Sequence, residues 1–425
     1  MIIHVVKPGE TAFSVANFYG VNPLKLISDN GLQTPSRLAV GQALVVQFPT
    51  VTHLVGAGES LWSIAQEYST TVNQLYRNNP ELNGLPNLNV GQTLVITYDQ
   101  EKQDMISVNG YAYPFIDKAL LRKTLPYLTY MTPFTYGITP EGGLVDLDDT
   151  ELISMAKEYG VAPLMHLSTL TPEGNFSNEL ASVVLNNPGI QNTLINNVLQ
   201  NLRQKGYSGL DIDFEFVFPQ DRYKYVELIQ NLTQRLNPEG YQVIAALAPK
   251  TSADQPGLFY EGHDYRGIGA AANAVLLMTY EWGYTYGPPM AVAPIDKVRA
   301  VLDYAVTEIP RDKIYLGIPN YGYDWTLPFV RGTSKAQSIS NQRAVELAVQ
   351  FGVPIQYDEV AQTPHFQYYN QDGSLHEVWF EDARSIRAKL ALIPEYGFLG
   401  AGYWNLMRPF PENWTLLNSL YQIRQ

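Results

Sequence analysis

The sequence predicts an α/β fold: a (β/α)8 TIM barrel with a small insertion, preceded by two small βααβ modules. Three observations support this prediction. Short apolar runs alternate with helical patterns over residues 104–425, two stretches near the amino terminus repeat each other, and acidic residues alternate with apolar ones within 209–215. Strands that alternate with helices are typical of a parallel sheet, and eight such units close into a barrel.

The composition describes a large globular protein. Its 425 residues are too many for one ordinary core, and 45% of them are hydrophobic. The net charge of −13 argues against nucleic acid or an anionic membrane surface as a partner. No run of 18 apolar residues occurs, so we expect no membrane-spanning segment. The 29 Tyr and 6 Trp residues offer aromatic faces of the kind that stack on sugar rings.

The residue types predict neither a cofactor nor a metal. The chain has no Cys, which excludes disulfides, thiol catalysis and Cys-ligated metals. The six His residues show no metal-ligand spacing; they are His4, His53, His166, His263, His365 and His376. Residues 1–6 carry neither a basic leader nor a long apolar core, so we expect no secretory signal.

Residues 4–46 and 53–96 repeat each other. The matches are His4 with His53, Gly9-Glu10-Thr11 with Gly58-Glu59-Ser60, and Val40-Gly41-Gln42 with Val90-Gly91-Gln92. Each unit predicts a strand, two helices and a strand, with Thr11 and Ser60 capping the first helix. We place the two modules at residues 2–48 and 51–98.

Both repeats resemble LysM modules nearly end to end. The resemblance implies that they bind the N-acetylglucosamine backbone of peptidoglycan or chitin. It also implies that the ligand lies in a shallow groove between the first turn–helix junction and the loop before the last strand. A pair of spacer domains is the alternative. Units this short bury little surface, which suits a binding module better than an enzyme.

The polar stretch 99–104 marks the boundary of a third domain, which we place at residues 104–425. Its eight predicted strands are 106–112, 128–134, 163–168, 209–215, 242–249, 274–281, 314–321 and 398–404. The best helical patterns are 178–204, 221–237, 294–307 and 382–395. The Tyr- and Gly-rich stretch 322–381, with a hairpin around 370–373, predicts an insertion between the last two strands that walls one side of a cleft.

Asp211, Asp213 and Glu215 recur at every second position within the fourth predicted strand. Side chains of a strand alternate with period two, so all three acids should point to one face. Stacking like charges along a buried strand is costly unless a site uses them. A solvent-facing edge strand and a calcium site are the alternatives. Neighbouring sequence favours a strand that is buried on both faces, and calcium ligands usually lie in a Gly-containing loop.

This row of acids resembles the Asp-x-x-Asp-x-Asp-x-Glu signature of glycoside hydrolase family 18, the chitinase-like enzymes. Ser208 stands in place of the first acid, which makes the charge balance of the remaining acids uncertain. The resemblance implies that Glu215 is the proton donor. It implies that Asp213 orients the substrate's acetamido group, that Tyr280 hydrogen-bonds the acetamido oxygen, and that Asp211 is a buried partner of Asp213.

Further candidate residues lie at the ends of the predicted strands, where barrel enzymes carry their chemistry. Met278-Thr279-Tyr280-Glu281 resembles the Met-x-Tyr-Asp of the family, with Glu281 in place of Asp. Trp404 ends the eighth strand, where the family places a Trp under the reacting sugar. We therefore expect substrate-binding roles for Trp404, Glu281, Tyr111, Asn320 and Tyr321.

Two LysM modules ahead of a family 18 barrel, without a signal peptide, resemble the spore cortex-lytic N-acetylglucosaminidases of endospore-forming bacteria. The resemblance implies a monomer that binds peptidoglycan glycan strands in the coat and cortex region of the spore and cleaves them with retention of configuration. Two alternatives remain. One is a chitinase or another endo-N-acetylglucosaminidase, and the other is a catalytically silent carbohydrate-binding coat protein. The three intact acids argue against the silent protein.

Overall fold

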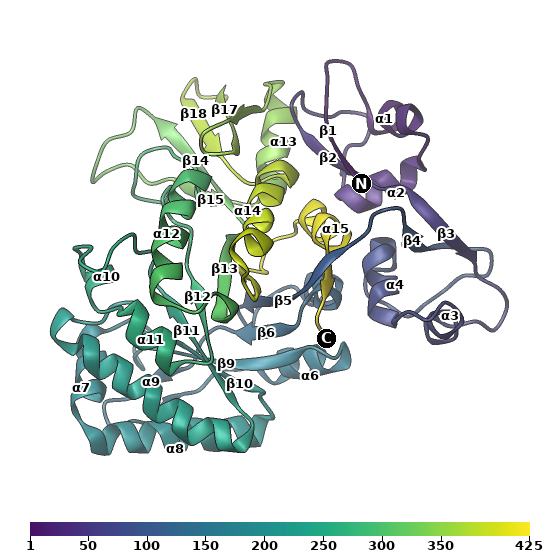
Figure 1. The fold of residues 1–425 in the computed structure, drawn as a ribbon. Helices are drawn as coiled ribbons and strands as arrows, with labels where there is room; N and C mark the ends of the chain where they lie inside the picture. The colour runs from purple at the N-terminus through teal and green to yellow at the C-terminus, as the bar shows by residue number, and fades with distance from the viewer.

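A computed structural model describes residues 1–425. Eight parallel strands form the centre of the fold: β5 (Gln103–Ala112), β6 (Tyr130–Pro133), β9 (Ala162–Ser168), β10 (Gly209–Asp213), β11 (Gln242–Leu247), β12 (Ala274–Leu277), β13 (Ile314–Pro319) and β19 (Gly400–Trp404). They pair in chain order, and β19 pairs back with β5. The sheet is therefore a closed barrel with helices around it, as predicted (Figure 1).

The main covering helices are α5 (Lys118–Thr124), α6 (Thr150–Glu158), α7 (Asn178–Asn186), α8 (Pro188–Lys205), α9 (Arg222–Leu236), α11 (Tyr265–Ala271), α12 (Ile295–Glu308), α14 (Ala383–Tyr396) and α15 (Pro411–Leu420). The prediction of one helix over 178–204 was wrong. Asn187 is extended and caps α8, and Pro188 opens that helix, because proline cannot continue the preceding one. No helix is long and apolar enough to cross a membrane.

Several predicted strands extend too far at their carboxyl ends. The fourth strand ends at Asp213 instead of 215, and the sixth ends at Leu277 instead of 281. All five residues of β10 are buried, so this strand is covered on both faces. Glu215, Tyr280 and Glu281 consequently lie in the loops that leave the barrel. A short strand that the sequence analysis missed, β20 (Tyr421–Ile423), pairs with the start of β5.

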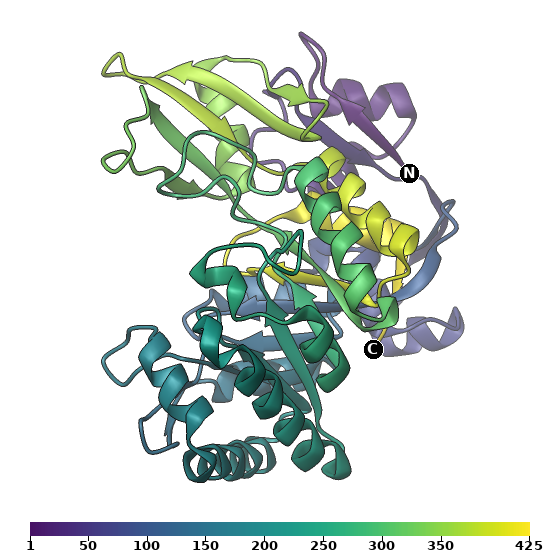
Figure 2. The same cartoon turned by 60° about the vertical axis from the view of Figure 1, so that its left-hand side comes forward.

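The predicted insertion between the last two barrel strands is a small subdomain. Five antiparallel strands form its sheet in the order β15 (Gln337–Ile339), β14 (Gly322–Leu327), β18 (Leu375–Trp379), β17 (Thr363–Tyr369) and β16 (Gln356–Asp358). The expected hairpin around 370–373 joins β17 to β18. Helix α13 (Asn341–Phe351) packs on this sheet. Figure 2 shows the subdomain standing above the barrel.

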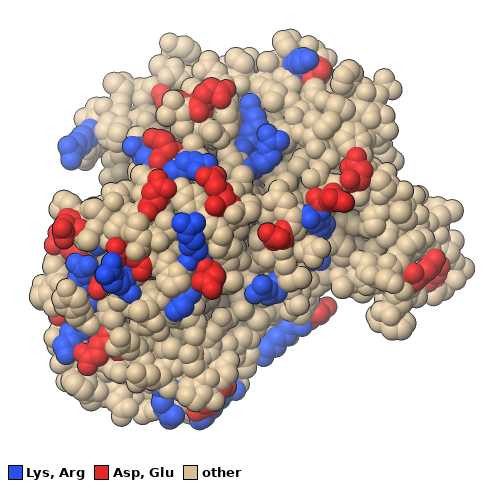
Figure 3. Space-filling view, viewed as in Figure 1, with Lys and Arg blue, Asp and Glu red and all other residues tan.

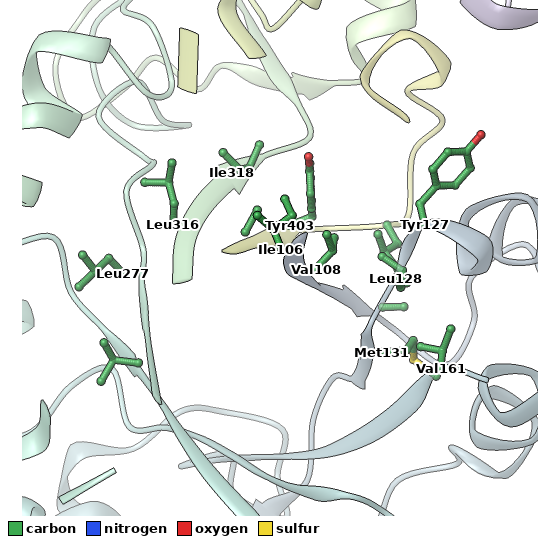
Figure 4. Close-up of a cluster of buried hydrophobic side chains, with 14 of the residues drawn as sticks. Ile106, Val108, Tyr127, Leu128, Met131, Val161, Leu277, Leu316, Ile318 and Tyr403 are labelled. Carbon is green, nitrogen blue, oxygen red and sulfur yellow. The ribbon is translucent and has the colours of Figure 1, made fainter. Parts of the chain in front are cut away.

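Two layers of apolar side chains hold the barrel. The larger layer lies between strands and helices, and Figure 4 draws part of it, including Val108, Met131 and Leu316. The smaller layer is formed by Tyr111, Leu164, Ile244, Ala274, Leu276 and Tyr315. Alternate residues of a strand face opposite sides, so β5, β9, β11, β12 and β13 each contribute to both layers. This packing fixes the strand ends that carry the polar side chains.

The amino-terminal repeats are two βααβ modules. Module 1 comprises β1 (Ile2–Val5), α1 (Ala12–Tyr19), α2 (Pro23–Asn30) and β2 (Ala43–Val46), and module 2 comprises β3 (Pro49–Leu54), α3 (Leu61–Glu67), α4 (Val72–Asn78) and β4 (Thr93–Tyr98). Thr11 and Ser60 cap α1 and α3 as expected. Helices α2 and α4 both pack against α15 of the barrel.

Candidate active site

The acid row lies at the mouth of the barrel. Asp211 and Asp213 are buried side chains of β10, two positions apart and so on the same face of the strand. Glu215 follows two residues after the strand ends, and its side chain is half-buried. The structure thus brings all three predicted acids to one end of one central strand, as the period-two pattern indicates.

Asp211 sits deepest in the row. The Tyr111 hydroxyl donates a 2.5 Å hydrogen bond to its Oδ2, and its Oδ1 has no hydrogen-bond partner. The pKa of Asp211 is raised to about 6, and burial is the main cause. The charge of Asp213 also raises this pKa, whereas the charge of His166 and the Tyr111 hydrogen bond lower it. Asp211 therefore takes up a proton close to neutral pH. Tyr111, predicted to bind substrate, contacts this acid directly.

The sequence analysis missed His166, the neighbour of Asp213. His166 Nε2 lies 3.5 Å from Asp213 Oδ2, and its Nδ1 lies 2.6 Å from Thr135 Oγ1. His166 is buried on β9, in register with Asp211 on β10. The other oxygen of Asp213, Oδ1, has no hydrogen-bond partner. A polar histidine inside an otherwise apolar strand was the signal in the sequence that could have revealed it.

The pKa of the Glu215 carboxyl is raised further than that of Asp211. Its pKa is raised to about 8, chiefly by burial, and the negative charges of Asp213 and Glu281 contribute to this shift. Both neighbouring charges that act on it are negative, so nothing favours its ionised form. Glu215 is consequently protonated at neutral pH, the state that a general acid requires.

Tyr280 and Glu281 lie in the loop that follows β12, three and four residues after the strand ends. The ring of Tyr280 fits beside Gly317, where a Cβ atom would lie 2.9 Å from Tyr280 Cε1. Burial raises the pKa of Tyr280 well above its ordinary value, and the charge of Asp213 is the next cause. Its hydroxyl therefore remains a hydrogen-bond donor across the working pH range.

Glu281 has a strained backbone, with a φ of 68° that lies in the left-handed region. Its exposed side chain accepts hydrogen bonds from Tyr321, at 2.6 Å, and from Tyr323, at 3.0 Å. Desolvation raises the pKa of Glu281, and the two hydrogen bonds oppose this shift. Tyr321 thus reaches the site through Glu281, and Tyr323 is a contact from the insertion that the sequence analysis missed.

Trp404 forms an aromatic floor at the end of β19. Its ring centroid lies 4.9 Å from that of Phe134, 5.8 Å from that of Tyr111 and 6.2 Å from that of Tyr113. Phe134 and Tyr113 were not predicted, although the Tyr-Ala-Tyr pattern at the end of the first barrel strand was a signal for Tyr113. The charge of Glu215 contributes to a raised pKa of Tyr113, after burial, so Tyr113 lies close to the acid.

Asn320 stands apart from the acids. Its side-chain amide donates to the backbone oxygens of Asn405 and Arg408, at 2.8 and 2.9 Å. Its backbone N–H donates to the carbonyl oxygen of Trp404 at 2.9 Å. Asn320 therefore holds the loop that carries Trp404, and its contacts are those of a positioning residue.

A group of three possible metal-ligating atoms lies outside the barrel, in module 2. His53, Glu59 and Glu67 place these atoms within 4.8 Å of one another. His53 and Glu59 bond each other at 2.8 Å, and His4 and Glu10 make the same bond at the same distance in module 1. The recurrence of this pair identifies it as part of the module fold.

Comparison with known proteins adds to this geometry. Residues 172–408 match the model of Glycosyl hydrolases family 18, and residues 4–47 and 53–97 match the LysM domain. The chain belongs to glycosyl hydrolase family 18. Membership of this family makes it a glycoside hydrolase on a (β/α)8 barrel, which confirms the predicted fold and enzyme class.

Family 18 relatives resemble the chain over almost its whole length. The cortical fragment-lytic enzyme of Bacillus anthracis is 40% identical, with 98% of this chain and 97% of the relative covered. The crystal structure of the Bacillus megaterium QM B1551 spore cortex-lytic enzyme SleL matches with a TM-score of 0.83 and 39% identity, covering 99% of this chain and 98% of that one. The crystal structure of the Bacillus cereus spore cortex-lytic enzyme SleL matches with a TM-score of 0.84 and 38% identity, covering 100% of this chain and 99% of that one.

Proposed function

We propose that this chain is an N-acetylglucosaminidase that hydrolyses spore cortex peptidoglycan, or its fragments, during germination. The observation that carries the proposal is the row of Asp211, Asp213 and Glu215 at the end of β10, in which burial and the charge of Asp213 raise the pKa of Glu215. Similarity to cortical fragment-lytic enzymes over nearly the whole chain supports the choice of polymer. The two LysM modules support binding of an N-acetylglucosamine-containing glycan.

Glu215 acts as the general acid in this proposal. Breaking a glycosidic bond requires a proton for the leaving oxygen and stabilisation of an oxocarbenium-like carbon. A carboxyl with a pKa of about 8 holds its proton at pH 7 and can transfer it to the leaving oxygen. The resulting carboxylate then accepts a proton from the water that resolves the intermediate.

The nucleophile is the substrate's own 2-acetamido oxygen, as in the substrate-assisted glycosidases. It bonds to the anomeric carbon as the bond to the leaving oxygen breaks, and the acetamido group gains positive charge. Asp213 orients this group and stabilises the developing charge, while the Tyr280 hydroxyl donates a hydrogen bond to its oxygen. Water then attacks the anomeric carbon, so the original configuration is retained.

Asp211, Tyr111 and His166 set the charge of Asp213. Two neighbouring carboxylates resist full ionisation, and the pKa of about 6 for Asp211 lets the pair share a proton near neutral pH. His166, 3.5 Å from Asp213, is the only basic side chain within 4 Å of that acid. We assign it the role of holding Asp213 in place.

The substrate-binding residues fall into two groups. Trp404 carries a sugar ring on its aromatic face, and Glu281 offers a carboxylate at the rim of the cleft. Tyr111, Tyr321 and Asn320 act through Asp211, Glu281 and the Trp404 loop respectively. The Trp404 loop and the Glu281 loop thus form the proposed sugar subsite.

We further propose that the enzyme works as a monomer in the coat and cortex region of the spore. The spore-associated relatives support this location. The net charge of −13 means that an anionic wall polymer must be held by shaped sites, because general electrostatic attraction is absent.

Mass spectrometry of reaction products tests the proposed function. The enzyme is incubated with cortex peptidoglycan and, separately, with chitin oligomers, and the Glu215→Gln variant is the control for contaminating activity. We expect cortex fragments that end in N-acetylglucosamine at the reducing terminus, and none from the variant. Cleavage of chitin oligomers alone would identify the protein as a chitinase, and no cleavage of either would favour a silent binding protein.

A further inference from the structure

The two LysM modules have the same fold but different surroundings. Both carry a loop before the last strand, residues 36–42 in module 1 and residues 86–92 in module 2, called here the Gly41 loop and the Gly91 loop. The Gly41 loop lies against the insertion, and the Gly91 loop is largely exposed. Figure 1 shows module 1 beside α13 and module 2 projecting from the side of the molecule.

The Gly41 loop is bonded into the catalytic domain. The backbone N–H of Ile355 donates to the carbonyl oxygen of Val40 at 2.8 Å, and the Arg384 guanidinium donates to the carbonyl oxygen of Gly41 at 3.1 Å. Ala39 belongs to the same buried hydrophobic cluster as the insertion. This side of module 1 is therefore built into the wall above the barrel.

The matched glycines display the difference most clearly. Gly41 and Gly91 adopt nearly the same left-handed conformation, with φ values of 85° and 82°. A Cβ atom on Gly41 would lie 2.0 Å from the carbonyl oxygen of Ile355, whereas one on Gly91 would meet nothing within 4 Å. The preceding residues agree, because Val40 is 37% exposed and Val90 is 72% exposed.

The groove between this loop and the first helix also differs. In module 1 the backbone N–H of Ala12 donates to the carbonyl oxygen of Pro35 at 2.8 Å, which ties the residue before the Gly41 loop to the start of α1. No backbone bond joins Leu61, the matching residue, to the loop of module 2. Beside this open groove Trp62 is 67% exposed, and its counterpart Phe13 is 49% exposed.

Module 2 docks on the barrel through the opposite side. The Arg77 guanidinium of α4 donates to the carbonyl oxygen of Pro126 at 2.7 Å, and Asn73 donates to that of Tyr159 at 2.7 Å. These contacts leave α3 and the Gly91 loop free. Residues 53–97 contain only four charged side chains, and Figure 3 shows this lobe almost without charge. Such a surface matches an uncharged, N-acetylated sugar strand better than an ionic partner.

We propose that the modules have different functions. Module 2 binds the glycan strand, and module 1 packs against the insertion beside the catalytic cleft and holds it in position. This division rests on the proposed function, because it takes an N-acetylglucosamine-containing strand as the ligand. Trp62 stacks on a sugar ring at the open groove, while the Gly41 loop holds the insertion through Ile355 and the barrel helix α14 through Arg384. The insertion in turn supplies Tyr323, one of the two tyrosines that hold Glu281.

A pelleting assay with insoluble peptidoglycan tests the division. All chains carry Glu215→Gln so that the polymer is not degraded, and the catalytic cleft makes the same contribution to each. We expect Trp62→Ala to raise the dissociation constant about tenfold and Phe13→Ala to change it by less than about twofold. Val90→Asp, at a highly exposed position, should weaken binding as Trp62→Ala does, with an unfolding temperature equal to that of the parent.

The outcomes separate this inference from the proposed function. Equal losses from Phe13→Ala and Trp62→Ala would overturn the division while leaving glycan binding intact. Unchanged binding of both Trp62→Ala and Val90→Asp would also overturn it. A parent chain that does not pellet with the polymer at all would contradict the binding role of both modules.

Discussion

Two buried aspartates of this enzyme differ in the number of hydrogen-bond partners that surround them. Asp149, at the start of α6, is surrounded by partners: the Lys205 ammonium donates to its Oδ1 at 2.9 Å, and the Tyr136 and Tyr207 hydroxyls donate to its Oδ2. Asp213, in the barrel mouth, has one oxygen without any partner and the other 3.5 Å from His166.

The difference separates structural from chemical use of a buried charge. A buried carboxylate is costly unless partners satisfy it, and Asp149 meets that condition within the fold. Asp213 Oδ1 has no hydrogen-bond partner within the fold. In the proposed mechanism, this oxygen and the negative charge of Asp213 act on the substrate. The same charge, together with burial, keeps the proton on Glu215. In the proposed mechanism, the acetamido group of the substrate becomes the partner of Asp213.

The largest expected effect is that of Glu215→Gln. Loss of a general acid typically lowers the rate by about 10²–10⁴-fold. We expect such a loss in kcat on soluble cortex fragments with an unchanged or slightly higher unfolding temperature, since a neutral amide replaces a carboxyl that is poorly solvated. Asp149→Asn is the matched control and should show the reverse pattern, with activity kept and stability reduced. Near-normal turnover by Glu215→Gln would remove Glu215 from the mechanism.

Removing the partner of Asp149 should destabilise the fold by about 2 kcal/mol. Breaking a fully buried ion pair costs about 3–5 kcal/mol, and the partial exposure of Lys205 reduces this figure. Denaturant unfolding of Lys205→Met measures the loss. The conservative variant Lys205→Arg keeps the charge and should lose less. If Lys205→Met unfolded like the parent, Asp149 would not need its cation, and the contrast with Asp213 would fail.

The pH dependence of kcat/KM should report the carboxyl of Glu215. Its raised pKa of about 8 means that the acid is protonated below this pH and loses its proton as the pH rises through it. Activity should therefore fall on the alkaline side, about tenfold per pH unit once above the pKa. A profile that already falls between pH 5 and 6 would show that Glu215 is not held in its protonated state.

A smaller change is expected from Glu281→Gln. The negative charge of Glu281 is one of the causes that raise the pKa of Glu215. Removing this charge should move the alkaline limb of the pH profile toward lower pH, in the direction opposite to the effect of burial. Glu346→Gln, at an exposed position of α13, is the control and should leave the limb in place. A limb shifted toward higher pH would contradict the assigned cause.

Most of the fold could be predicted because its signals are local. Apolar runs place the eight strands, and the alternation of Asp211, Asp213 and Glu215 gives the face that they share. Strand ends were less certain, since the chain leaves the barrel at residues whose composition still resembles a strand, such as Met278 to Glu281. The break before Pro188 was visible in the sequence and should have divided the predicted helix.

Other parts depend on contacts between distant segments. His166 meets Asp213 only because β9 and β10 pair in one register, and Phe134 and Tyr113 meet Trp404 only because the barrel closes. The docking of the Gly41 loop on Ile355 joins residues more than 300 positions apart. No local pattern records such contacts. The bounds of the three domains and the catalytic roles stay predictions from the sequence.

The central claim is that Asp213 serves a substrate that brings its own nucleophile, and a double comparison tests it most directly. Turnover by the parent and by Tyr280→Phe is measured on an N-acetylated substrate and on the same substrate with a free amine. We predict that loss of the hydroxyl lowers kcat about 10²-fold on the acetylated substrate. The free-amine substrate should be cleaved very slowly by the parent, and Tyr280→Phe should then make little difference. Rapid cleavage of the free-amine substrate would mean that a protein carboxylate is the nucleophile, and would contradict this account.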